Sequence, residues 1–144
     1  METKNANGGA GFTEYNDGTI QFETTQWSQG YYDNGKIWQT FTLPKGKYEM
    51  RIEVKNAANI GSGSTNIHFA VAQGESLPDN EELEKSDIIL SYLKFESEHT
   101  NKTSALPIFE LTEEKTITVG WVVSFSDICR NIEFKSVRLW SVAE

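Results

Sequence analysis

Apolar and polar residues alternate with a period of two along most of this chain. Between positions 48 and 54, for example, Tyr48, Met50, Ile52 and Val54 alternate with charged residues. Successive side chains of a β-strand point to opposite faces of its sheet, so this pattern predicts strands that bury one face. We expect eight such strands, at residues 20–22, 37–43, 48–54, 67–71, 90–95, 108–111, 117–125 and 132–140.

The last expected strand changes phase half-way along its length. Ile132 and Phe134 follow one alternation, whereas Val137 and Leu139 follow the other. One extra residue in the strand, a β-bulge, would turn all four side chains to the same face. We therefore expect a bulge near residues 135–136.

The connections between the expected strands are short. Residues 43–47 (Leu-Pro-Lys-Gly-Lys) predict a tight turn, and only residues 77–85 favour a helix, of one or two turns. Short strands without a helix long enough for a parallel crossover predict an all-β fold, an eight-stranded antiparallel β-sandwich of jelly-roll topology. An up-and-down barrel around a ligand cavity is the main alternative. The predicted core contains Tyr48, Met50, Ile52, Phe69, Val119, Trp121 and Val123.

Length and composition favour one soluble domain. The polar, glycine-rich residues 1–11 are expected to be a linker or an added remnant, which leaves residues 12–144 as a single β-sandwich domain. No charged segment followed by an apolar run marks a signal peptide, and no stretch approaches the roughly 18 apolar residues that span a bilayer. Cys129 is the only cysteine, so no disulfide within the chain can form, and we expect it to be a small buried side chain.

The charge of the chain argues against two classes of partner. The 13 basic residues are scattered among 21 acidic ones, and the net charge is −8. Binding to nucleic acid or to an anionic membrane requires clustered Lys and Arg. We therefore expect neither nucleic-acid binding nor membrane insertion.

The loops of an antiparallel sandwich fall alternately at its two ends, and one end collects distinctive side chains. Residues 26–35, 55–66, 97–104 and 126–131 meet there. Aromatic rings beside amide and charged groups suit a sugar, whose ring face stacks on an aromatic while its hydroxyls form paired hydrogen bonds. The candidate ligand-binding residues are Trp27, Tyr31, Tyr32, Asp33, Asn34, Asn59, Arg130 and Asn131.

Structural roles are the alternative for these residues. Asn is favoured in turns for its own backbone, and a loop aromatic can close the end of the core. A site on a sheet face, around the outward-facing Trp38, is a second alternative for the position of the ligand.

No catalytic or metal motif stands out. The two histidines, His68 and His99, lack ligand-like spacing, and we expect His68 to be a solvated or sheet-surface residue on the face opposite Ile67 and Phe69. No nucleophile elbow or phosphate-binding loop occurs. No cofactor is therefore expected, and structural calcium stays open because carboxylates are present without EF-hand spacing.

Three stretches carry a family resemblance. They are residues 41–50 with a Leu-Pro-x-Gly-x-Tyr turn, residues 69–78 with Val-Ala-x-Gly followed by Leu-Pro-Asp, and residues 117–125 ahead of the terminal strand. They resemble a Bacteroidetes domain family of unassigned function that occurs in surface lipoproteins. The resemblance implies a galactose-binding-like jelly roll, located outside the cell or on the outer membrane and attached to other domains of polysaccharide-utilisation proteins. The resemblance identifies no functional residue in this chain, because the family has no defined site motif to match.

The sequence thus favours a non-catalytic carbohydrate-binding module of a larger cell-surface or secreted protein. Its expected partners are a glycan and the other domains of that protein. The alternative is a structural or protein-interaction sandwich without a glycan site. A stand-alone enzyme is the least favoured class, because no catalytic constellation is visible.

Overall fold

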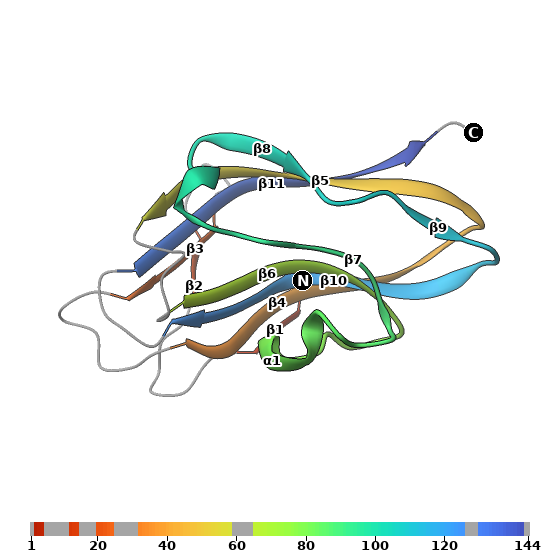
Figure 1. The fold of residues 1–144 in the computed structure, drawn as a ribbon, viewed down its shortest axis with the longest axis horizontal. Helices are drawn as coiled ribbons and strands as arrows, with labels where there is room; N and C mark the ends of the chain where they lie inside the picture. The colour runs from red at the N-terminus through yellow and green to blue at the C-terminus, as the bar shows by residue number, and fades with distance from the viewer. Residues whose placement is uncertain are drawn as a thin grey trace.

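Two antiparallel sheets pack face to face and contain most of the described chain (Figure 1). The computed structural model describes residues 2–4, 12–14, 20–24, 32–58, 65–125 and 130–142. Sheet A runs in the order β1 (Glu2–Lys4), β4 (Tyr32–Leu43), β10 (Lys115–Phe125), β6 (Thr65–Gln73) and β7 (Ile89–Lys94). Sheet B runs in the order β2 (Phe12–Glu14), β3 (Ile20–Thr24), β11 (Arg130–Val142), β5 (Gly46–Ala58) and β8 (Lys102–Ala105), and β9 (Phe109–Leu111) also pairs with β5. The connections hold α1 (Asn80–Leu83) and a short 3-10 helix, η2 (Ser97–His99).

The longest strands pair with partners that are distant in the chain. β4 pairs with β10 and not with β5, and β11 pairs with β5 and not with β10. Consecutive strands of an up-and-down barrel pair with each other, so the barrel is excluded and the predicted antiparallel β-sandwich is confirmed.

All eight expected strands are present, and three further strands, β1, β2 and β8, were not expected. Each of the three has only three or four residues, too few for an alternating pattern to be visible in the sequence. β1 lies within residues 1–11, the stretch interpreted as a linker, and pairs with residues 36–38 of β4.

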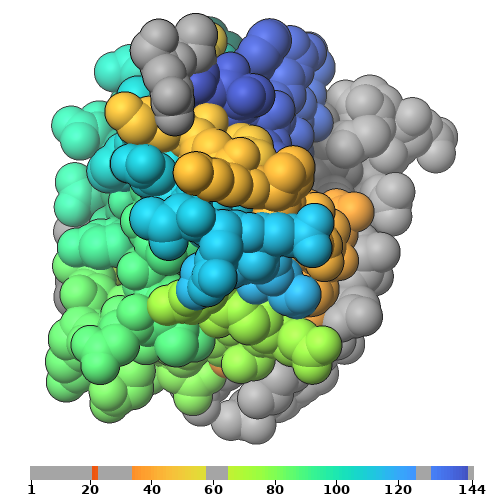
Figure 2. Space-filling view, turned by 90° about the vertical axis from the view of Figure 1, so that its right-hand side faces the viewer, coloured from red at the N-terminus to blue at the C-terminus, as the bar shows by residue number. Residues whose placement is uncertain are grey.

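The strand ends that flank the loops predicted to share one end of the sandwich do lie together. In sheet A, Phe125 pairs with both Tyr32 and Thr65, and in sheet B the pairs Arg130–Thr24 and Asn131–Ala58 form the last rungs. We call this the loop end; it lies on the left in Figure 1. Figure 2 looks onto the opposite end, where the turns that follow β4 and β9 lie close together.

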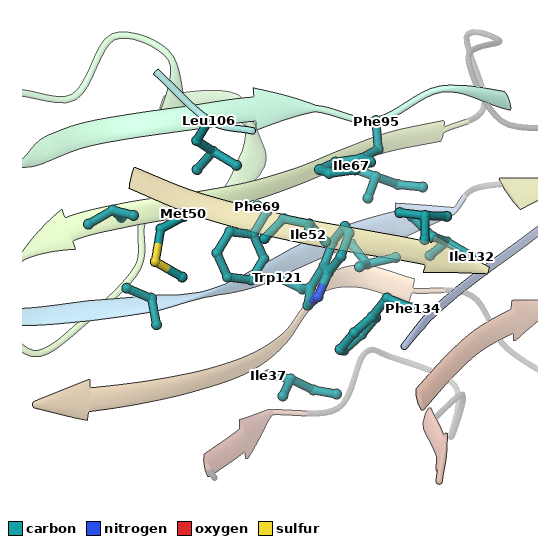
Figure 3. Packing of buried hydrophobic residues seen from close by; sticks show 14 of the residues in the cluster. Ile37, Met50, Ile52, Ile67, Phe69, Phe95, Leu106, Trp121, Ile132 and Phe134 are labelled. Atoms are coloured by element: carbon teal, nitrogen blue, oxygen red, sulfur yellow. The ribbon is translucent and has the colours of Figure 1, made fainter. Parts of the chain in front are cut away.

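The core between the sheets is built around Trp121 of β10 (Figure 3). Its ring packs edge-on against Phe69 at 5.3 Å between centroids and stacks on Phe134 at 4.8 Å, and Phe95 lies at 4.7 Å. Trp121 is only 1% exposed, and its indole N–H has no hydrogen-bond partner among the described residues. The core positions expected from the alternation are all buried: Tyr48, Met50, Ile52, Phe69, Val119, Trp121 and Val123.

The ladder between β5 and β11 contains two bulges. It skips one residue on each strand, Lys55 on β5 and Lys135 on β11, and the register beyond the pair is the same as before it. The bulge predicted near residues 135–136 is therefore confirmed. The apolar side chains on both sides of it belong to the core or pack against it: Ile132, Phe134, Val137 and Leu139.

The outer face of sheet A is covered by α1 and the segments beside it. Leu77 and Leu83 pack on Ala70, Ala72 and Val122 in a second apolar cluster, separate from the main core. Trp38 of β4 is half-buried against this cluster. The alternative site around Trp38 would therefore lie beside a covered face.

Side-chain hydrogen bonds hold α1 in place. Asn34 has a φ of 56°, and its side-chain oxygen accepts the backbone N–H of Asn80 at 2.7 Å. The Asn34 side-chain amide also donates to Glu81 at 3.3 Å. Asn80 is itself buried and donates to the Asn66 carbonyl and to the Ser124 hydroxyl. A helix of four residues has little stability alone. These hydrogen bonds, together with the packing of Leu83, therefore fix it on the sheet.

His68 lies on the sheet surface, one of the two predicted alternatives, but it is not solvated, because α1 covers it. The side chain lies on the outer face of β6 as expected, but it is fully buried. Its ring nitrogens face the Asn80 side-chain oxygen at 2.8 Å and the Glu84 carboxylate at 3.0 Å, both of which are acceptors. The hydrogen bond with His68 holds the pKa of Glu84 below its ordinary value, although partial burial opposes the shift. Asn80 and Glu84 are one helical turn apart, which brings both onto the face that meets the sheet.

Replacement of Trp121 by Ala should be severely destabilising. A large side chain lost from a packed core costs about 3–5 kcal/mol through lost contacts and a residual cavity. Chemical denaturation of Trp121→Ala measures this loss. Trp121→Phe should lose less, because it keeps a ring and removes an indole N–H that has no partner among the described residues. A Trp121→Ala protein that melts within a degree or two of the wild type would contradict this packing.

Asn34→Gly should lower the stability by about 1–3 kcal/mol, because it leaves the buried Asn80 N–H without its acceptor. Glycine tolerates the positive φ, so the backbone itself is not strained. Asn101→Gly is the matched control, since Asn101 has the same φ of 56° but is exposed. Equal unfolding free energies for the two variants would show that Asn34 does not anchor α1.

Candidate functional site

The structure brings the flanks of the predicted loop site to one end of the molecule, but it describes few of the predicted side chains. Three of the predicted residues lie outside the described residues: Trp27, Tyr31 and Asn59. Three others are described by their strand backbone alone: Tyr32, Asp33 and Arg130. Of the predicted set, the side chains of Asn34 and Asn131 can therefore be placed.

Asn34 and Asn131 both serve the fold. The Asn34 amide holds α1 with its oxygen and its nitrogen, as described above. Asn131 lies in the other sheet, is 8% exposed, and accepts a hydrogen bond from Gln21 at 2.7 Å, which links β11 to β3. For a ligand at the loop end, these two residues would act indirectly, because they position the strands next to the ligand-binding loops.

A second candidate surface lies on the outer face of sheet B. Trp140 of β11 points away from the core and is 46% exposed. The Arg51 guanidinium lies over its ring, 5.6 Å from the centroid, and the Arg51 Nε donates to Glu49 at 2.6 Å. A cation held over the indole fixes the orientation of the ring. Trp140, Arg51 and Glu49, together with Arg138, which pairs with Arg51, form what we call the Trp140 face.

Among the described side chains, one further large hydrophobic residue is strongly exposed, and it adjoins the Trp140 face. Ile108 is 53% exposed and directly precedes Phe109 of β9, which pairs with Tyr48 along one edge of β5. Trp140 of β11 pairs with Glu49 along the other edge of β5. Two exposed apolar side chains thus flank one short segment of β5, with charged groups between them.

The sequence contains a signal for the Trp140 face, although none of the residues predicted for the ligand site belongs to this face. Beyond the bulge, Val137 and Leu139 face inward, so Arg138 and Trp140 must face outward. A large aromatic residue at an outward strand position exposes apolar surface unless another element covers it, and such exposure often marks a binding surface. The alternation gives the direction of the side chain, but it does not tell whether the face is covered.

Within the described ranges, no three His, Cys, Asp or Glu side chains come together in a way that could hold a metal ion. No helix in the same ranges is long and apolar enough to cross a membrane.

Several solved structures share this fold. The xylan-binding module CBM15 is similar over 99% of this chain and 91% of that module, with a TM-score of 0.55 and 13% identity. TmCBM61, solved with β-1,4-galactotriose, is similar over 98% of this chain and 88% of that one, with a TM-score of 0.52 and 11% identity. A chain from the structure of accessory secretory proteins 1, 2 and 3 of Streptococcus pneumoniae is similar over 93% and 91%, with a TM-score of 0.51 and 7% identity. At these identities the likeness establishes the fold alone.

Sequence similarity places the chain in a family. No curated protein matches it in sequence. Residues 1–120 match the family model of DUF5013, described as a domain of unknown function. Because the match covers well over half of the sequence, the chain belongs to the DUF5013 family.

Proposed function

We propose that this chain is a non-catalytic carbohydrate-binding module whose ligand contacts the Trp140 face. The observation that carries the proposal is the exposed Trp140 ring beside Arg51 and Glu49. A sugar presents an apolar ring face, which stacks on an aromatic side chain, and hydroxyl groups that both donate and accept hydrogen bonds. Arg51 supplies donors and Glu49 supplies acceptors within reach of a ring stacked on Trp140.

The fold is consistent with this proposal, although the fold alone does not identify a function. A xylan-binding module and a module solved with a galactotriose share the sandwich. A rigid sandwich can present a ligand site either on an outer sheet face or on the loops at one end. In this chain α1 covers part of the outer face of sheet A, whereas Trp140 on the outer face of sheet B is 46% exposed.

The loop end is retained as a second contact region of the same module. Its proposed residues are Trp27, Tyr31, Tyr32, Asp33, Asn34, Asn59, Arg130 and Asn131. Arg130 and Asn131 begin β11, the strand that also carries Trp140. A long glycan that lies along β11 would reach both regions.

The setting proposed for the module follows from the family resemblance. We place it in a larger secreted or cell-surface protein of a polysaccharide-utilisation system, where it holds the neighbouring domains near their substrate. A structural or protein-interaction role is the competing proposal. The presence or absence of glycan binding distinguishes the two.

Glycan-array screening followed by titration tests the proposal. A weak glycan ligand with a millimolar Kd needs only about 4 kcal/mol of binding free energy, so one stacked ring supplies a large share. Trp140→Ala should weaken binding of the best array hit by about tenfold or more, equivalent to about 1.4 kcal/mol. Trp140→Phe keeps an aromatic face and should retain most of the affinity. Because Trp140 is half-exposed, both variants should fold normally.

Parallel titrations of Trp27→Ala, Tyr31→Ala and Tyr32→Ala locate the contribution of the loop end. A loss of affinity in one of them, with Trp140→Ala unaffected, would move the main site to the loops. If the folded wild-type domain binds nothing on a broad array, the carbohydrate-binding proposal is wrong and the protein-interaction role takes its place.

A further inference from the structure

A polar recess lies on sheet B beside the segment that leads to the loop end. Its volume is about 370 Å³, and its walls come from β5, β8, β11 and the turn before β8. The side chains that matter here line it together: Glu53, Lys55, Asn101, Lys102, Thr103 and Lys135. Three of these six are lysines, in a chain whose net charge is −8.

Two of the lysines lie at the paired bulges. Lys55 and Lys135 are the residues that the ladder skips, one on each strand. A bulge inserts one extra residue, so two consecutive side chains point to the same side of the sheet and do not alternate. As a result Lys55 is exposed next to the exposed Asn56, and Lys135 is exposed next to the half-exposed Ser136. Bulges often occur beside binding sites for this reason.

Two of the three lysines lie beside carboxylates, and Lys55 takes part in a further interaction. The Lys55 ammonium lies 3.5 Å from the carboxylate of Glu133, and that of Lys135 lies 4.0 Å from Glu53. Lys102 is exposed and has no ion pair within the described part of the chain. Each ammonium carries three donors and no acceptor. Among the described residues, three ammonium groups thus meet two carboxylates, and the ammonium groups supply the hydrogen-bond donors that an anionic group needs.

The position of the recess connects it to the Trp140 face. The β5–β11 ladder starts at the pair Lys47–Val142; the pair Glu49–Trp140 lies near this start, the bulges follow, and the pair Ala58–Asn131 comes last, at the loop end. Trp140 and Lys135 are five positions apart, which is about 17 Å along a strand. A glycan stacked on Trp140 and running toward the loop end would cross the recess.

We infer that this recess binds an acidic sugar residue, one that carries a carboxylate or a sulfate, within a glycan that also contacts Trp140. The ammonium groups of Lys55, Lys102 and Lys135 bind the anionic group. Thr103 and Asn101 supply hydroxyl and amide partners for the neighbouring sugar hydroxyls. This inference rests on the proposed carbohydrate-binding function and specifies the class of its ligand.

Binding to charge-matched glycan pairs tests it. The panel contains neutral oligosaccharides, uronate oligosaccharides beside their methyl esters, and sulfated oligosaccharides beside their desulfated forms. The wild type should prefer the charged member of a pair, and that preference should weaken when the salt concentration is raised from about 0.05 to about 0.5 M. The uronate and sulfate arms identify which anion is recognised.

Two triple variants separate a local effect from a change in total charge. Lys55→Gln/Lys102→Gln/Lys135→Gln should lower affinity for the charged glycan by about tenfold, from the small contributions of three exposed charge pairs. It should leave the neutral counterpart unaffected. Lys45→Gln/Lys85→Gln/Lys94→Gln changes the net charge equally at exposed lysines outside the recess and should change both affinities less than about twofold. Circular dichroism and thermal melting confirm that both variants are folded.

The other outcomes are equally informative. Equal affinity for the charged and neutral members, or a charge preference that survives the recess variant, overturns the inference and leaves the proposed carbohydrate binding intact. An array on which no glycan binds overturns the proposed function, and the inference falls with it.

Discussion

The packing of Trp121 between the two sheets is the constraint on which the rest of the structure depends. Its ring contacts Phe69 of sheet A and Phe134 of sheet B, so it ties the two layers together. Phe134 stays in phase with the inward residues beyond it only because Lys135 is bulged out, and Lys55 compensates for that insertion on the neighbouring strand. The core therefore fixes where the bulges occur, and the bulges determine which lysines reach the outer surface.

The two outer faces of the sandwich have different chemistry, and this difference favours one of them as a binding surface. Sheet A presents Ala70, Ala72 and Val122 outward, and a bare apolar face of this kind is costly in water. α1 covers it and brings polar groups that need partners, which Asn34 and His68 supply. Sheet B presents charged residues and Trp140 outward. Such a face is compatible with water, and among the described residues its Trp140 side chain stays 46% exposed.

Most of the fold could be predicted from the sequence, because strand alternation is a local property. It gave the eight main strands, the core positions and even the bulge near Lys135. The same alternation showed that His68 and Trp140 face outward, but it did not show that α1 covers one and leaves the other exposed. That difference depends on where a four-residue helix docks, which is set by contacts between distant residues such as Asn34 and Asn80. The candidate site was therefore harder to predict than the fold.

The acidity of the chain and the positive recess act over different distances. At physiological ionic strength the Debye length is about 8 Å, so the net charge of −8 is screened beyond the immediate surface and repels a glycan weakly at long range. Three lysines around one recess act within hydrogen-bonding distance, where screening matters least. Such a surface would not collect polyanions indiscriminately, as a basic protein does. It would bind an acidic sugar only where the neighbouring sugars of the glycan also fit. Recognition of the charge in the recess would then depend on stacking of a sugar ring on Trp140.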